Sequence, residues 1–449
     1  MAADKYVRSG RRKFLPPSAL PVFVAVAIFM TGSSIVEMYN ASTLRYEPIV
    51  DSLVEPAFWF LSFVAACSVV TNSETAESLI KGFILPVFLA VPLAVAQVLD
   101  IEPVIRFTTL VVSGRGVADS VAEGELLRAG GLVGGWTSFG AYLTGVFAAA
   151  IALMILNRQR SEPLTILPLA VAVLCIVGLL TTLTFSTAIA FVVLLVGSAR
   201  RLGFHPGVFA AAVGAVVLAV FAFGSRIRSR FAEQFDSSVG YVDWLPEWVP
   251  NTLGYRIFVW GSQTIPSILE RPVTGWGNKV YLVTLQEFGA ADVDRIRPAG
   301  LEWSSAESQW LWTLMNSGVL GLALLVILLC GILSPIRLGW RSSEARWIAL
   351  PVALLLASNI AIAFTAIGLT NKGLPGTLWP LLGVVAALAG GRQELAKPSR
   401  ISAVAQFNSA EGARRERISV RASGPVSHDA ASCRSMDCIS EWESGDRKR

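Results

Sequence analysis

The chain has 449 residues, of which 53% are hydrophobic and 15% charged, and its formal net charge is +5 at pH 7. Apolar stretches with almost no charge recur along it, and about 20 such helical residues cross a hydrocarbon core of about 30 Å. This composition excludes a water-soluble globular protein, and the small net charge gives no reason to expect a nucleic-acid partner. We therefore expect an all-α polytopic membrane protein.

Composition divides the chain into five blocks. They are a basic cytoplasmic N-terminus (1–19), seven spans (20–223), one large external loop (224–306), three more spans (307–391) and a disordered cytoplasmic tail (392–449). The expectation is thus about ten transmembrane helices. We place them near residues 20–36, 54–71, 79–98, 137–156, 163–181, 185–199, 207–223, 307–333, 347–368 and 374–390.

Positive charge predicts the orientation of these spans. Alternate short connections carry arginines, at positions 158, 160, 200, 201, 337, 341 and 346. Because arginine and lysine collect in cytoplasmic loops, we assign these connections and both termini to the cytoplasm. The loop at 100–136 and the loop at 224–306 are then external.

Cysteine usage predicts no structural disulfide and no metal. Three of the five cysteines lie in apolar stretches, and Cys433 and Cys438 lie in the tail near His428 with the wrong spacing for a zinc site. We expect no cofactor.

The large loop contains the densest polar and aromatic segment. It opens with Arg226 and neighbouring arginines, which either reach lipid headgroups or bind phosphate. A helix carrying Arg256 follows, and we expect Pro266 to kink or restart it. Its apolar residues recur at helical spacing, at Leu253, Ile257, Trp260, Thr264 and Ile268. This pattern predicts an amphipathic helix in the outer membrane interface.

Glu307 has two interpretations. Ser304 and Glu307 have the spacing of a capping box, in which the two residues close the first turn of the eighth span. Alternatively, the carboxylate acts as a base at the outer membrane face. Arg256 has a corresponding structural alternative, an ion pair with Glu270 or another acid.

The order of motifs resembles the O-antigen ligase and Wzy-type polysaccharide polymerase superfamily over about residues 120–330. The motifs that carry it are Arg128-Ala129-Gly130-Gly131, Arg256, Trp260, Pro272 with Gly275 and Gly277, Glu307-Ser308-Gln309-Trp310-Leu311, and Gly318 with Gly321. The resemblance implies a transferase in the bacterial plasma membrane, with its active site on the external face. The donor would be a glycan on undecaprenyl pyrophosphate, held in the bilayer, and other polysaccharide assembly proteins are possible partners.

The resemblance also implies site residues. Glu307 stands at the catalytic position. Arg256, Arg128 and Arg226 would bind the pyrophosphate, because a guanidinium offers a permanently charged fork. Sugar contacts would come from three tryptophans, Trp260, Trp276 and Trp310.

Two departures from the family pattern affect the predicted activity. The ligase branch has a histidine where Glu307 stands, and the chain has only His205 and His428, both cytoplasmic in the predicted topology. A threonine, Thr187, stands where the family often has a second phosphate-binding arginine, so Lys372 joins Arg128 and Arg226 as a possible substitute. We therefore favour a polymerase over a ligase, with a transporter or a non-catalytic scaffold as further alternatives.

The predicted topology can be tested by labelling single cysteines from outside the cell. A cysteine in place of Asp292 should react with a membrane-impermeant maleimide, and cysteines in place of Arg341 or Ser419 should not. The opposite pattern would place the large loop in the cytoplasm.

Overall fold

A computed structural model describes most of the membrane-embedded chain. It covers residues 15–40, 47–111, 128–163, 165–202, 249–277, 307–367, 369 and 373–396, with single residues between 214 and 246. Every regular element in these ranges is helical. They are η1 (Pro17–Ala19), α2 (Leu20–Asn40), α3 (Glu47–Val69), α4 (Ser73–Ile84), α5 (Val87–Val98), α6 (Glu102–Val111), α8 (Trp136–Gln159), α9 (Ile166–Thr182), α10 (Phe185–Leu202), α12 (Asn251–Val259), the π-helical turn η2 (Trp260–Thr264), α13 (Ile265–Glu270), α15 (Gln309–Arg341), α16 (Arg346–Ile362) and α17 (Gly373–Ala396).

The all-helical membrane fold is confirmed for the described residues. Six helices are long and apolar enough to cross a membrane, and three apolar helices are shorter, namely Leu53–Val69, Ile166–Thr182 and Arg346–Ile362. Each predicted span except the seventh overlaps one of these helices. The seventh, 207–223, lies almost wholly outside the described residues, so ten spans stay a prediction, as does the disorder of the tail beyond Ala396.

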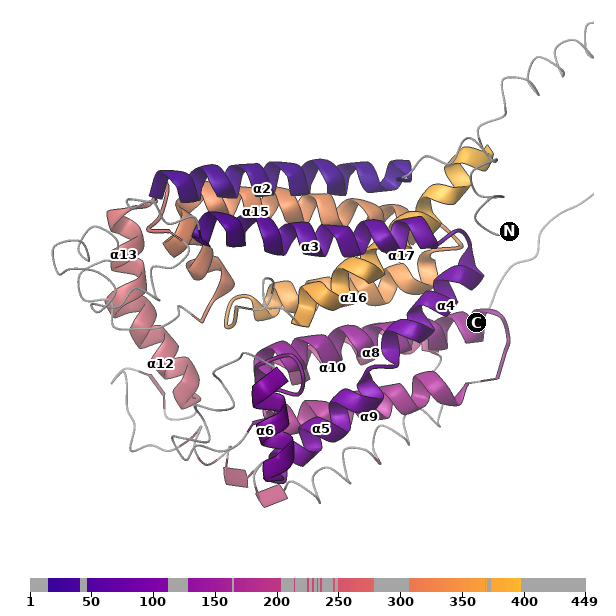
Figure 1. The fold of residues 1–449 in the computed structure, drawn as a ribbon, viewed down its shortest axis with the longest axis horizontal. Coiled ribbons are helices and arrows are strands. Elements are labelled where there is room, and N and C mark those ends of the chain that lie inside the picture. The colour runs from indigo at the N-terminus through magenta and orange to yellow at the C-terminus, as the bar shows by residue number, and fades with distance from the viewer. Residues whose placement is uncertain are drawn as a thin grey trace, which may run out of the picture. The chain divides into compact units, whose positions relative to one another are not determined.

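Burial identifies α8 as the central helix. In an 18-residue apolar stretch of this helix 94% of the residues are buried, against 28% in the corresponding stretch of Pro17–Asn40 and 33% in that of Phe185–Leu202. Small residues allow this close packing: a Cβ on Gly145 would lie 2.0 Å from Thr377 Oγ1 on α17, and a Cβ on Gly140 would lie 2.7 Å from Thr187 Cγ2 on α10. Helices α9, α10, α16 and α17 surround α8, while α2, α3 and α15 pack side by side (Figure 1).

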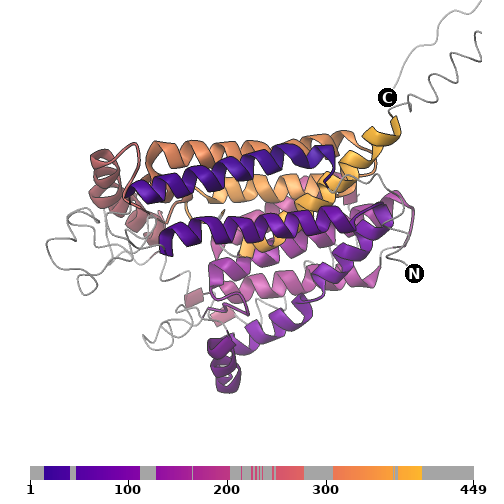
Figure 2. The ribbon, with the colours of Figure 1, turned by 45° about the horizontal axis from the view of Figure 1, so that its top comes forward.

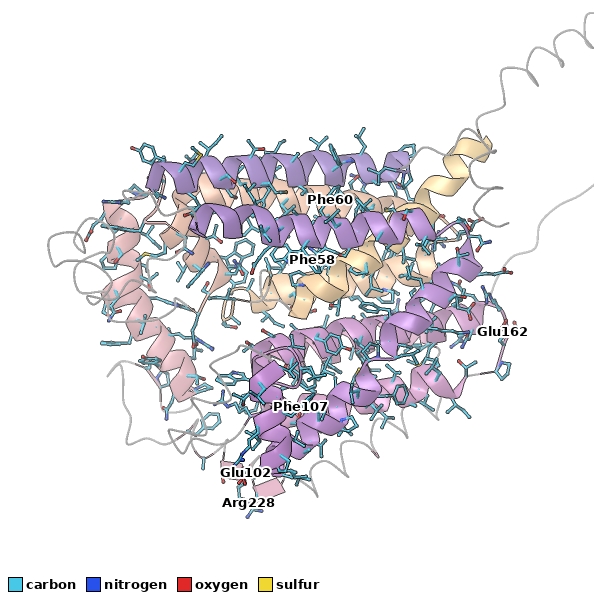
Figure 3. All side chains as sticks on the ribbon, viewed as in Figure 1. Phe58, Phe60, Glu102, Phe107, Glu162 and Arg228 are labelled. Atoms are coloured by element: carbon cyan, nitrogen blue, oxygen red, sulfur yellow. The ribbon has the colours of Figure 1, made fainter. Side chains whose placement is uncertain are left out.

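Two basic residues meet one carboxylate where α8 ends. Arg160, at the end of α8, bonds to Glu77 of α4 with 2.6 Å between Nη1 and Oε2, and Lys81 bonds to the same carboxylate at 2.6 Å. Figure 3 shows Glu162, just beyond α8, at the end opposite to Glu102 and Phe107 of α6. The connection after α8, which is predicted to be cytoplasmic, therefore lies at the end opposite to α6, which is predicted to be external.

Two of the expected outer loops are partly helical. Helix α6 occupies part of the predicted 100–136 loop, because Gln97 at the end of α5 donates to Thr108 Oγ1 at 2.8 Å and holds the short helix in place. The residues between the first two predicted spans, 37–53, form an outer connection in the predicted topology and are also mainly helical, since α2 continues to Asn40 and α3 begins at Glu47.

Helix α15 is broken near its start. Gly318 has φ 62° and ψ −161°, which lie outside the helical region, so residues 309–317 and 319–341 form two helical segments. The segment 272–277 supplies the hydrogen bonds that the break removes. Trp276 and Gly277 donate backbone N–H groups to the carbonyls of Met315 and Asn316 at 2.9 and 2.8 Å.

The bonds also run in the other direction. Val319 and Leu320 donate to the carbonyls of Pro272 and Val273 at 2.9 and 3.2 Å. Unpaired backbone groups are very unfavourable inside a membrane, so this pairing makes the break possible. We call the paired segments 272–277 and 315–320 the junction.

Two glycines allow the segments of the junction to approach. A Cβ on Gly318 would lie 2.3 Å from the Val273 carbonyl, and a Cβ on Gly275 would lie 2.5 Å from the Asn316 carbonyl carbon. Both glycines also have positive φ, at 62° and 68°.

Replacing Gly318 with alanine should therefore destabilise the protein by about 3 kcal/mol, because the change combines a backbone clash with a strained φ. The measurement is thermal unfolding in detergent. Gly376→Ala is the matched control, since a Cβ there meets nothing within 4 Å in a helix. Equal unfolding midpoints for the two variants would contradict the packing argument.

Candidate functional site

Arg256 and Glu307 form an ion pair although they are 51 residues apart in the sequence. Arg256 Nε donates to Glu307 Oε2 at 2.6 Å, and the two side chains are 24% and 41% exposed. The structural alternative for Arg256 was an ion pair with Glu270 or another acid, and the acid in the structure is Glu307. An ion pair this exposed stabilises a protein by about 1 kcal/mol or less, so its contribution to folding is small.

The capping-box interpretation of Glu307 is wrong. Helix α15 begins at Gln309 with Ser308 as its N-cap, so Glu307 lies before the helix and not in its first turn. Glu307 instead has a left-handed backbone with φ 45°, which is unusual for a residue with a long side chain. Such strain persists only where neighbouring contacts impose it, and it is most frequent at functional sites.

Contacts of the two residues after Glu307 hold the backbone on its C-terminal side. The Gln309 N–H donates to the carbonyl of Ala363 at 2.8 Å and approaches that of Ala366 at 3.2 Å. The Ser308 hydroxyl adds a longer bond to Ala363 at 3.4 Å. The start of α15 is thus fixed to the end of α16, and the carboxylate of Glu307 is presented from a fixed position.

Arg256 is placed by a helix that changes its pitch. Pro266 has no N–H to donate to the preceding turn, and the Ile265 N–H bonds to Trp260 O, five residues back, instead of four. At Pro266, where we expected the helix to kink or restart, the structure has a π-helical turn, η2, between α12 and α13. Helices α12 and α13 lie across the ends of α2 and α15 (Figures 1 and 2).

The predicted apolar stripe of this helix faces the protein. Thr264 is fully buried, and Ile268 packs against Trp276 and Met315. A different set of apolar residues is exposed, with Phe258 at 44%, Ile265 at 46% and Leu269 at 71%. The helix therefore has one apolar side against the protein and another that is open to its surroundings.

The three predicted sugar-contact tryptophans have different environments. Trp276 is only 6% exposed, its indole N–H donates to Ser267 O at 2.8 Å, and the Arg271 guanidinium covers its ring at 4.0 Å. These contacts give it a packing role. Trp310 packs on Phe364 with 5.7 Å between ring centroids, and its buried indole N–H has no hydrogen-bond partner among the residues that the structure describes. Trp260 is half-buried in η2.

Arg128 belongs to a separate cluster of contacts. Its guanidinium lies 5.1 Å from the ring centroid of Trp136 at the start of α8. The glycine stretch after it is fixed, because Gly131 N–H donates to Gln97 Oε1 at 3.0 Å and Ala129 N–H donates to Thr181 O at 3.1 Å. Arg226 and Lys372 lie outside the described residues, so the second phosphate-binding residue stays a prediction.

Sequence reasoning missed two polar residues at the end of α2. Glu37 is 5% exposed and Asn40 is 9% exposed, and Asn40 bonds directly to the junction. The available signal was an acidic residue beside an otherwise uncharged apolar stretch, which indicates a functional or structural role by itself.

One comparison with known proteins identifies the region around this site. A family model described as O-antigen ligase matches residues 169–326, which is about a third of the chain and includes Arg256, Glu307 and the junction. No curated protein matches the chain.

Proposed function

We propose that this membrane protein, whose residues 169–326 match a family model described as O-antigen ligase, is a lipid-linked glycosyl transferase of the polymerase type. Its donor would be a glycan on undecaprenyl pyrophosphate, and its acceptor a hydroxyl on a second glycan. The reaction would take place on the outer face of a bacterial plasma membrane. The observation that carries the proposal is the Arg256–Glu307 pair.

Arg256 retains the groups that a pyrophosphate needs. The ion pair uses Nε, and within the described part of the chain the two Nη groups have no partner. These groups form a fork that binds two phosphate oxygens, and the charge on it is permanent. Glu307 therefore orients Arg256 while leaving its fork open to an anionic leaving group.

Glu307 supplies the second requirement, a proton acceptor. The acceptor hydroxyl oxygen would form a bond to the anomeric carbon of the donor as the bond from that carbon to the pyrophosphate oxygen breaks. The electron pair of the broken bond leaves with the lipid pyrophosphate, facing Arg256, and the hydroxyl proton passes to the Glu307 carboxylate. The exposed fraction of Glu307, 41%, leaves its carboxylate accessible to an acceptor.

The residue at position 307 favours a polymerase over a ligase. A glutamate stands where the ligase branch has histidine, and the chain has two histidines in total, at positions 205 and 428. A transporter would need ionisable groups at mid-membrane depth. In the described helices the one charged residue among the buried side chains is Glu37, near the end of α2 rather than at its centre.

Purified protein in detergent distinguishes transferase from transporter and scaffold. With a lipid-linked oligosaccharide as the sole glycan, the protein should lengthen the glycan without an ion gradient. Absence of product from folded protein, with donors of several repeat structures, would refute the transferase proposal.

Glu307→Gln should leave folding and insertion unchanged and lower the transfer rate by about a hundredfold or more, because the amide cannot accept the proton. Transfer to lipid-linked acceptor is the measurement. Glu102→Gln breaks another exposed ion pair, the one with Arg106 on α6, and should retain activity. The exchange variant Arg256→Glu with Glu307→Arg can re-form the pair, so activity in that variant would show that the pair is purely structural.

Arg256→Lys keeps the charge but loses the fork. We expect a decrease in kcat/KM of about ten- to a hundredfold, since a hydrogen bond to a charged group contributes about 1.5–3 kcal/mol. Protein amount should not change. Near-normal transfer by this variant would mean that Arg256 does not bind the leaving group.

A further inference from the structure

The end of α2 contacts both segments of the junction. Asn40 donates its side-chain Nδ2 to the Thr274 carbonyl at 2.7 Å and lies 3.4 Å from the Asn316 carbonyl. One amide group thus contacts both segments that meet at the break in α15. In Figures 1 and 2 the ends of α2 and α15 lie together beside α13.

Glu37 lies one turn earlier on the same side of α2. Its side chain is buried, at 5% exposure, and its Oε2 lies 3.7 Å from the position that a Cβ on Gly277 would take. Burial of a carboxylate is unfavourable unless its surroundings compensate the charge. An acidic residue in this position requires a structural or functional reason.

The helix that begins after Gly318 lies where it contributes to this compensation. Helices α2 and α15 are antiparallel, since Gly32 lies against Leu324 and Gly331 lies against Ala25. Continuing the register places Glu37 level with the start of the segment 319–341. The N-terminus of a helix carries a partial positive charge, so the carboxylate stabilises the break at its polar end.

Both residues of the candidate site extend from this junction. Arg256 lies on the helical run 251–270 that ends just before it, and Glu307 lies at the far end of the segment 309–317 that ends in it. At about 1.5 Å per residue, Arg256 is about 20 Å from the junction along its helix, so a tilt of about 10° would move it by about 3 Å. Displacements of about 1 Å can reduce catalysis by a hundredfold.

We propose that Glu37 and Asn40 are positioning residues for the transfer reaction. They fix the angle between the helix that carries Arg256 and the segment that carries Glu307, and neither touches the reacting atoms. This inference rests on the proposed function for its catalytic consequence, while its geometric content can be measured separately.

Kinetics of the full-length protein test the catalytic consequence. Asn40→Leu removes the donors at similar volume, and Glu37→Gln removes the charge; each should lower kcat per folded protein by at least about tenfold. Asn157→Leu is the matched control, because Asn157 is also a buried asparagine, at 3% exposure, and lies at the C-terminal end of α8. Its Nδ2 donates to Thr165 Oγ1 at 2.9 Å. This variant should lower the unfolding midpoint without lowering kcat.

Spin labels test the geometry without requiring activity. Cysteines at Gly261 and Ser343, both exposed, would report the distance from η2 to the far end of α15, with Cys330, Cys433 and Cys438 replaced by serine. We expect Asn40→Leu and Glu37→Gln to shift or broaden this distance by several ångströms, and Asn157→Leu to leave it unchanged.

Two results would overturn the inference. One is an unchanged label distance in the Asn40 and Glu37 variants, and the other is a loss of kcat that Asn157→Leu shares. If the unmodified protein transfers no glycan, the proposed function fails, and the label distance alone then decides whether Glu37 and Asn40 set the junction.

Discussion

The break in α15 is the constraint on which the site depends. A helix that stops inside a membrane protein leaves backbone N–H and carbonyl groups that water cannot reach, and these groups need partners within the chain. The segment 272–277 provides partners on both sides of Gly318. Because the segment is also the continuation of the helix that carries Arg256, the same hydrogen bonds connect the two halves of the site.

The ion pair between Arg256 and Glu307 contributes little to folding, so stability does not explain why the two side chains are held together. Its two side chains are partly exposed, in a region where solvent weakens their attraction. The left-handed backbone of Glu307 is unfavourable by itself. A weak attraction together with local strain is understandable where a side chain must be presented to a substrate, and less so where it merely stabilises the fold.

The sequence predicts elements well where length and hydrophobicity decide them. The spans expected at 137–156 and 185–199 correspond to α8 and α10, because an uninterrupted apolar stretch has no other stable conformation in a membrane. The break at Gly318 could not be predicted, since its partner lies about 45 residues earlier and the pairing is non-local. The same reason explains why the sequence suggested an ion pair of Arg256 with Glu270 or another acid but could not identify Glu307 as that acid.

The exposed apolar residues of the helical run 251–270 bear on where a substrate could meet Arg256. Phe258, Ile265 and Leu269 are open to the surroundings, while the opposite side packs on the protein. A helix with this distribution is most stable at the boundary between hydrocarbon and water. On the proposed function, the pyrophosphate of a polyprenyl donor lies at the same boundary, because its chain is apolar and its phosphates are charged. Arg256 would then meet the leaving group at the depth where the lipid itself holds it, and the glycan would extend outward towards Glu307.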